Sequence, residues 1–192
     1  MSTSPTRQRL INAASQRFYR DGFREVGIDQ ILNDVGISKT AFYKHFQSKD
    51  DLMLAVMDEQ DQWLREHFRS MVNKLGGSEP RARLLALFDA VDQIVRLDEF
   101  RGCFFVNVAM EFPLPHDPAH VAAAANKQAM QEIVMQLARE AGADCAEKLA
   151  KELMLLMEGA YVTRHVTGDE EAVSTARDAA AVLIDRRLAS AS

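Results

Sequence analysis

Residues 27–46 read GIDQILNDVGISKTAFYKHF, and this stretch decides the fold class. From Ile28 to Val35 the apolar residues recur at the i, i+3, i+4, i+7 spacing of a helix with one buried face. Gly36 stops that helix at a position where a left-handed backbone is common. Ser38 can then cap a second, shorter helix. The stretch therefore predicts two helices joined by a tight turn.

The second helix is expected to bury one aromatic pair and to expose its polar residues. Phe42 and Phe46 are four residues apart, so they point inward together. In a helix-turn-helix the first helix supports the second, whose exposed residues meet base edges in the major groove of DNA. A helical hairpin with a glycine turn is common in helical proteins, so the turn alone is a weak indication of DNA binding. The residues expected to be exposed are Lys39, Thr40, Tyr43, Lys44 and His45.

A more specific indication comes from the sequences VGISKTAFYKHF at 35–46 and SKDDL at 48–52. Together with Phe23 and Ile28 to Ile31, these residues closely resemble the N-terminal domain of the tetracycline-repressor (TetR) family. The resemblance covers about residues 7–57 and implies a three-helix DNA-binding domain with its helix-turn-helix at about 27–46. It further implies a homodimer that binds a palindromic double-stranded operator and responds to a small-molecule effector. Repression is the family's usual mode, and activation stays open.

The resemblance also implies roles for individual residues. Lys39 and Thr40 occupy the base-reading start of the recognition helix, while Tyr43 stands against the DNA backbone within reach of a base. His45 and Lys49 match positions that hold phosphates. Lys44 is as well explained by a solvated surface charge as by a phosphate contact. Gly27 stands where the family usually has a capping hydroxyl, so its backbone amide would replace a side-chain contact. The expected DNA-binding set is Gly27, Ser38, Lys39, Thr40, Tyr43, Lys44, His45 and Lys49.

The rest of the chain also reads as helical, and about nine helices are expected in an all-α protein. No segment alternates with period two between turn signals, which is the pattern of a half-buried strand. Gly76-Gly77-Ser78 is the first clear break, and the proline-rich segment 112–118 predicts a loop. Asp117 and Pro118 then predict a helix start. We therefore expect residues 58–192 to form a helical domain for effector binding and dimerisation.

The last two predicted helices, about 144–168 and 170–189, are apolar on more than one side. Such helices need more than one neighbour. In the resembled family the corresponding helices form half of a four-helix dimer interface, and a dimer also suits a two-fold operator. The residues expected at the dimer interface are Leu149, Leu153, Leu156, Met157, Ala176, Ala180 and Leu183.

The resemblance implies an effector pocket in residues 58–192. Cys103, Asn107 and Glu111 recur every four residues, so they share one face of a predicted helix from about 103 to 112. This face is either the solvent side of that helix or a polar stripe that binds a ligand. In the second case the Cys103 thiol, which lies beside a helix start, could sense electrophiles or oxidants. Each methionine among the apolar candidates is better explained as an ordinary core residue. The predicted pocket residues are Cys103, Phe105, Asn107, Met110, Glu111, Met130, Met154 and Glu158.

Composition and motifs argue against several other functions. The net charge is −5, but residues 1–57 carry +2 and the remainder −7, which suits a nucleic-acid partner for the first part. No phosphate-binding loop, dinucleotide fingerprint or nucleophile elbow indicates an enzyme or a cofactor. His116 and His120 make an incomplete metal site beside prolines. Without a leader or membrane span, we expect a cytoplasmic protein. A helical adaptor without DNA binding is the alternative, and intact Lys39 and Tyr43 argue against it.

Overall fold

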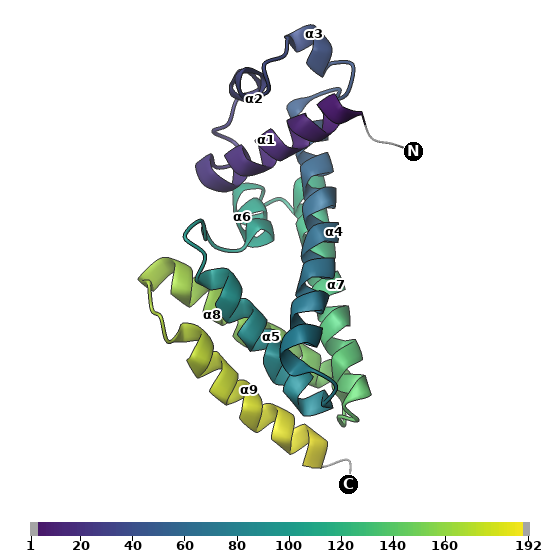
Figure 1. Cartoon of the computed structure of the whole chain (residues 1–192), viewed down its shortest axis with the longest axis vertical. Coiled ribbons are helices and arrows are strands. Elements are labelled where there is room, and N and C mark those ends of the chain that lie inside the picture. The colour runs from purple at the N-terminus through teal and green to yellow at the C-terminus, as the bar shows by residue number, and fades with distance from the viewer. Residues whose placement is uncertain (1–3, 190–192) are drawn as a thin grey trace. The chain divides into compact units, whose positions relative to one another are not determined.

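The computed structural model describes residues 4–189, which contain nine helices and no strand (Figure 1). The expected all-α class and helix number are confirmed for this part of the chain. The helices are α1 (Pro5–Asp21), α2 (Ile28–Val35), α3 (Lys39–Phe42), α4 (Lys49–Gly76), α5 (Pro80–Val95), α6 (Phe104–Glu111), α7 (Pro118–Glu140), α8 (Ala146–Thr167) and α9 (Ala172–Ala189).

Helix boundaries follow local sequence signals. The Asp117 carboxylate accepts a hydrogen bond of 2.8 Å from the Ala119 amide, and Pro118 opens α7 as the sequence predicts. Gly36 ends α2 with a left-handed φ of 72°. Helix α3 is shorter than expected, because it ends at Phe42. The chain then turns, and the His45 amide donates to the Phe42 carbonyl at 2.8 Å. This tighter turn still buries Phe46.

The described residues form two compact units. Unit 1 holds the chain up to Trp63 together with Phe104–Asn126, and unit 2 holds Leu64–Cys103 together with the chain from Lys127 onward. Unit 1 thus contains α1, α2 and α3, the first part of α4, α6 and the first part of α7. The helix-turn-helix therefore shares a compact unit with α6, which lies far beyond residues 7–57 in the sequence.

Each unit has an apolar core. In unit 1 the buried side chains include Phe18, Phe23 and Phe42, and the Phe18 and Phe23 rings stack with centroids 5.2 Å apart. In unit 2 one continuous cluster joins α5, α8 and α9, with Phe88 and Leu153 among its fully buried members. Burial of an aromatic or leucine side chain contributes about 1.5–3 kcal/mol, so these clusters fix the packing of each unit. Within residues 4–189, no helix is long and apolar enough to cross a membrane.

Candidate nucleic-acid interface

The turn between α2 and α3 is held by backbone and side-chain hydrogen bonds. The amides of Gly36 and Ile37 both donate to the Leu32 carbonyl, at 2.8 and 3.2 Å. Ser38 has an extended backbone, and its hydroxyl accepts from the Ala41 amide at 3.2 Å. These bonds satisfy groups that helix ends leave without partners. The predicted site residue Ser38 is thus the cap that starts α3.

The side chains predicted to face DNA are exposed on α3 and the turn after it. Phe42 is fully buried, whereas Lys39 and Thr40 are exposed. Tyr43 is 55% exposed, so it is not a half-buried core aromatic, and its ring lies nearly perpendicular to the Phe42 ring with the two centroids 5.3 Å apart. Lys44 is exposed as well. This short segment therefore presents a cation, a hydroxyl and an aromatic ring on one surface.

Two of the predicted cations already have partners in the free protein. The Lys39 ammonium lies 3.1 Å from a carboxylate oxygen of Asp29, and both side chains are largely exposed. An exposed ion pair contributes between 0 and about 1 kcal/mol, so Lys39 can exchange it for a contact with DNA. The Lys49 ammonium donates to the Arg24 carbonyl at 3.2 Å. An ammonium has three donors, so two remain for a phosphate.

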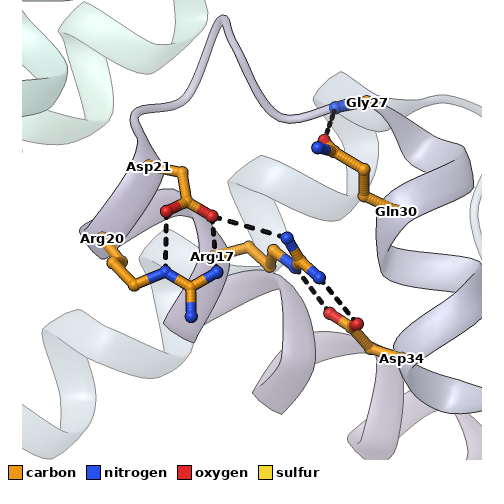
Figure 2. Close-up of polar contacts among 6 residues, drawn as sticks. All are labelled: Arg17, Arg20, Asp21, Gly27, Gln30 and Asp34. Atoms are coloured by element: carbon orange, nitrogen blue, oxygen red, sulfur yellow. Dashed lines mark hydrogen bonds and ion pairs between the residues drawn. The ribbon is translucent and has the colours of Figure 1, made fainter.

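Gly27 precedes α2 with an extended backbone. Its amide donates to the side-chain oxygen of Gln30 at 2.7 Å (Figure 2). The Gly27 amide is therefore not bare in the free protein, and the predicted contact with a phosphate would have to replace its hydrogen bond to Gln30. Gly27 is exposed, while His45 is half-buried. Sequence reasoning missed Gln30, although a Gln three residues after a helix cap is a known capping signal.

Ion pairs connect α1 to α2 and so stabilise the position of α2, the helix that supports α3. The Arg17 guanidinium makes a two-pronged contact with the Asp34 carboxylate, at 2.6 and 2.7 Å (Figure 2). Asp21 lies 3.6 Å from Arg17 and is also bound by Arg20 at 2.6 Å. The hydrogen bonds from Arg17 lower the pKa of Asp34, although partial desolvation opposes them. Further along, Arg9 donates to the Val35 carbonyl at the end of α2.

The turn between α1 and α2 is captured by a residue of α6. The Glu111 carboxylate accepts from the Phe23 amide at 3.0 and 3.1 Å and from the Arg24 amide at 2.9 Å. The Arg24 guanidinium lies over the Phe112 ring, 5.1 Å from its centroid. Because the Arg24 carbonyl accepts from Lys49, Glu111 also holds the residue to which Lys49 is bonded.

The sequence analysis places Glu111 in an effector pocket, whereas the structure shows its carboxylate bonded to the turn between α1 and α2. Its carboxylate is occupied by backbone amides, because the turn at Gly22 (φ 91°) leaves those amides without helical acceptors. The sequence signals that such a turn needs an acceptor. It does not indicate that the acceptor lies 88 residues away.

The remaining predicted pocket residues are divided between the two units. Unit 1 contains Phe105, which is buried, Asn107, which is half-buried, and Met110, which is 76% exposed. Unit 2 contains Met130 and Met154 in its apolar core. A recess in unit 2 is lined by side chains of α4, α5 and α7 and includes none of the eight predicted residues. The exposure of Met110 argues against its place in an enclosed pocket.

Cys103 and Glu158, in contrast, lie close together. Both are bonded to Lys127, whose ammonium lies 3.1 Å from the Cys103 sulfur and 2.6 Å from a Glu158 carboxylate oxygen. Cys103 immediately precedes α6, as expected within one residue. Lys127 was absent from the expected set, because its position on α7 opposite Cys103 follows from tertiary packing alone.

The predicted dimer interface is largely wrong, because most of its residues face the core of their own protomer. Leu153 is fully buried against unit 2. The same holds for Leu149, Met157, Ala176 and Ala180. Leu156 and Leu183 are half-buried. The large exposed apolar residues described on these two helices are instead Leu155, Val162 and Val166 on α8 and Val182 on α9.

The predicted absence of a metal site concerns His116 and His120. His116 is exposed, and a ring nitrogen of His120 lies 2.8 Å from the Phe112 carbonyl. Among residues 4–189, no three His, Cys, Asp or Glu side chains are grouped closely enough to hold a metal ion.

Comparison with known sequences identifies two family matches. Residues 10–56 match the family described as bacterial regulatory proteins, tetR family, and residues 80–180 match the tetracyclin repressor-like C-terminal domain. The second match alone covers more than half of the chain. Both descriptions are of regulatory proteins, in agreement with the expectation that the chain is not an enzyme.

Individual relatives agree with these matches. The chain is 29% identical to the transcriptional regulator AcuR of Cereibacter sphaeroides over 73% of this chain and 64% of AcuR. It is 33% identical to the HTH-type transcriptional activator FasR of Mycolicibacterium smegmatis over 45% of this chain and 40% of FasR. The chain thus spans less than two thirds of the length of these curated relatives. A TetR-family regulator from Streptomyces coelicolor has a similar structure, with a TM-score of 0.79, 29% identity and coverage of 97% of this chain and 95% of that one.

Proposed function

Because the chain belongs to the tetR family of bacterial regulatory proteins, we propose that it is a transcriptional repressor that binds operator DNA through α2 and α3. The observation that carries the proposal is the exposure of Lys39, Thr40 and Tyr43 on a segment whose position is fixed by Phe42, Ser38 and the tie between α1 and α2. A rigid support of this kind lets a short helix present its side chains to the major groove.

We assign base reading to the start of α3. Lys39 can donate hydrogen bonds to the O6 and N7 acceptors of a guanine. Thr40 can contact either a base edge or a thymine methyl. Tyr43 stands beside them and contacts the DNA backbone. Lys44, His45 and Lys49 hold phosphates, which positions the protein without reading sequence. Gly27 and Ser38 act through the helix starts that they form.

The proposed domain division follows from these roles. Residues 7–57 bind DNA, with the helix-turn-helix at about 27–46. Residues 58–192 bind a small-molecule effector and dimerise, although Glu111 of this part supports the DNA-binding turn through the Phe23 and Arg24 amides. The protein acts on double-stranded DNA in the cytoplasm.

The proposed homodimer uses the exposed apolar stripe of α8 and α9. Leu155, Val162 and Val166 are spaced by seven and four residues, so they line one side of α8, and Val182 is exposed on α9. Apolar residues on an otherwise polar surface mark an interaction site when they are contiguous. A two-fold dimer then places two α3 segments on the two halves of a palindromic operator.

Selection of binding sites from random double-stranded DNA tests the proposal. The full chain is expected to enrich a palindrome with half-sites about one helical turn apart, at a spacing set by the dimer. A gel shift with the enriched site should show loss of binding in a Lys39→Ala, Tyr43→Ala double variant that keeps its helical content. Failure to enrich any sequence would favour the helical adaptor without DNA binding.

A further inference from the structure

Unit 2 contains a cluster of three reactive or charged side chains: Cys103, Lys127 and Glu158. The Lys127 ammonium lies 3.1 Å from the Cys103 sulfur and 2.6 Å from a Glu158 carboxylate oxygen. The side chains of Lys127 and Glu158 are 31% and 29% exposed. A nucleophilic atom, a cation and an acid therefore meet at a site that is shielded but still open to small molecules.

The ammonium of Lys127 is held in its charged form. Burial alone would lower the pKa of Lys127, but attraction to Cys103 and Glu158 outweighs that effect, so the pKa is raised. A cation at hydrogen-bond distance favours the thiolate form of a cysteine, and the thiolate is the nucleophile. The geometry thus places a positive charge beside the Cys103 sulfur.

Glu158 has two opposing effects on the sulfur. Its carboxylate accepts one N–H of Lys127 and so fixes the ammonium beside Cys103. Its negative charge also disfavours a second negative charge on the nearby sulfur. Loss of Lys127 and loss of the Glu158 charge should therefore change thiolate reactivity in opposite directions.

Cys145 provides an internal comparison. Each of the two cysteines directly precedes a helix, Cys103 before α6 and Cys145 before α8, so a helix N-terminus would act on both sulfurs. Cys145 is the more exposed of the two. The hydrogen bond from Lys127 distinguishes Cys103 from Cys145. A difference in reactivity that favours Cys103 would therefore reflect the cation and not exposure.

From this geometry we propose that Cys103 is a covalent modification site for soft carbon electrophiles of the α,β-unsaturated carbonyl class. The Cys103 thiolate adds to the β-carbon, a sulfur–carbon bond forms, and the electron pair of the carbon–carbon π bond moves to the carbonyl oxygen as an enolate. Lys127 donates a proton to the enolate α-carbon and regains one from water. The thiol and the alkene together become a thioether, and no oxidant or reductant takes part.

Competitive alkylation of the full chain with acrylamide, an α,β-unsaturated amide, measures the two cysteines in one sample. Mass spectrometry of the peptides gives each rate near neutral pH. Lys127→Met should slow Cys103, and Glu158→Gln should speed it. Because a tenfold change in the thiolate fraction is offset by about a threefold opposite change in nucleophilicity, the expected slowing and the expected acceleration are each about threefold. Lys74→Met, which removes an exposed lysine of α4, serves as the matched control and should change neither rate.

Opposite changes in the two variants also separate the proposal from unfolding. Partial unfolding would expose Cys103 and speed its alkylation in both variants, whereas the proposed electrostatic effect slows one and speeds the other. An unchanged or increased Cys103 rate in Lys127→Met overturns the proposal, as does a Cys145 rate above that of Cys103 in the parent. The readout is the adduct mass, so the outcome does not depend on whether the chain binds DNA.

Discussion

Replacement of Glu111 by alanine should destabilise the turn between α1 and α2, because this carboxylate accepts the amides of Phe23 and Arg24 at 2.9 to 3.1 Å. A hydrogen bond to a charged group contributes about 1.5–3 kcal/mol net. Arg24 is exposed, so water can replace the lost acceptor there, whereas Phe23 is buried. Only the Phe23 amide then carries the full penalty, and we expect a loss of about 2–3 kcal/mol in the free energy of unfolding.

The loss should also reach DNA binding. The Arg24 carbonyl accepts from Lys49, so a displaced turn moves the partner of a proposed phosphate-binding ammonium. Urea unfolding gives the stability, and fluorescence anisotropy with the enriched operator gives the affinity at a temperature where the variant is folded. Glu111→Gln keeps one acceptor oxygen and should show about half of the stability loss.

Glu25→Ala is the matched control for both measurements. Glu25 is an exposed acid in the same turn, so its replacement makes the same change in net charge. We expect a stability change within about 0.5 kcal/mol for this surface substitution. If Glu111→Ala costs no more than Glu25→Ala, the role assigned to Glu111 is refuted.

Three further predictions concern the support of α3, the dimer and acid sensitivity. Gly27→Ser should stabilise the chain by about 0.5–1 kcal/mol in thermal unfolding, because φ is −84°, the new Cβ meets nothing closer than 3.8 Å, and serine is a better cap; a loss of stability would contradict this account. Leu155→Glu or Val166→Glu should give folded monomers in sedimentation, whereas charge at the buried Leu153 should unfold the protein; dimers in both surface variants would place the interface elsewhere. The lowered pKa of Asp34 means that its contribution to stability is present above the ordinary value of 3.8 and is lost as pH falls through the lower folded value. Unfolding measured in acid should therefore show a weaker pH dependence in Asp34→Asn, and identical profiles would refute the contribution.

Features set by neighbouring residues were predictable from the sequence. Gly36, Ser38 and the Asp117-Pro118 pair define helix ends through local backbone chemistry, and the structure places them as expected. The exposure of Tyr43 followed from the burial of Phe42 beside it.

Features set by tertiary packing were not predictable. Helix α8 is apolar on two sides, so the sequence could not show that Leu153 faces the core and Leu155 the solvent. Glu111 and Lys127 find their partners 88 and 24 residues away, and no periodic pattern relates such distant positions. Glu111 and Lys127 alter the predicted sites most, because their hydrogen bonds determine which backbone amides and side chains already have a partner in the free protein.

The most direct test of the account compares Thr40→Ala with Lys49→Ala in binding-site selection and in the salt dependence of operator affinity. Thr40 lies at the exposed start of α3, so its loss should alter the preferred sequences at a cost of about 1–3 kcal/mol and leave the salt slope unchanged. Lys49 opens α4 and should contact only phosphate, so its loss should weaken all sequences alike and flatten the slope by about one unit. If Lys49→Ala changes the preferred sequences while Thr40→Ala does not, α3 is not the element that reads the operator.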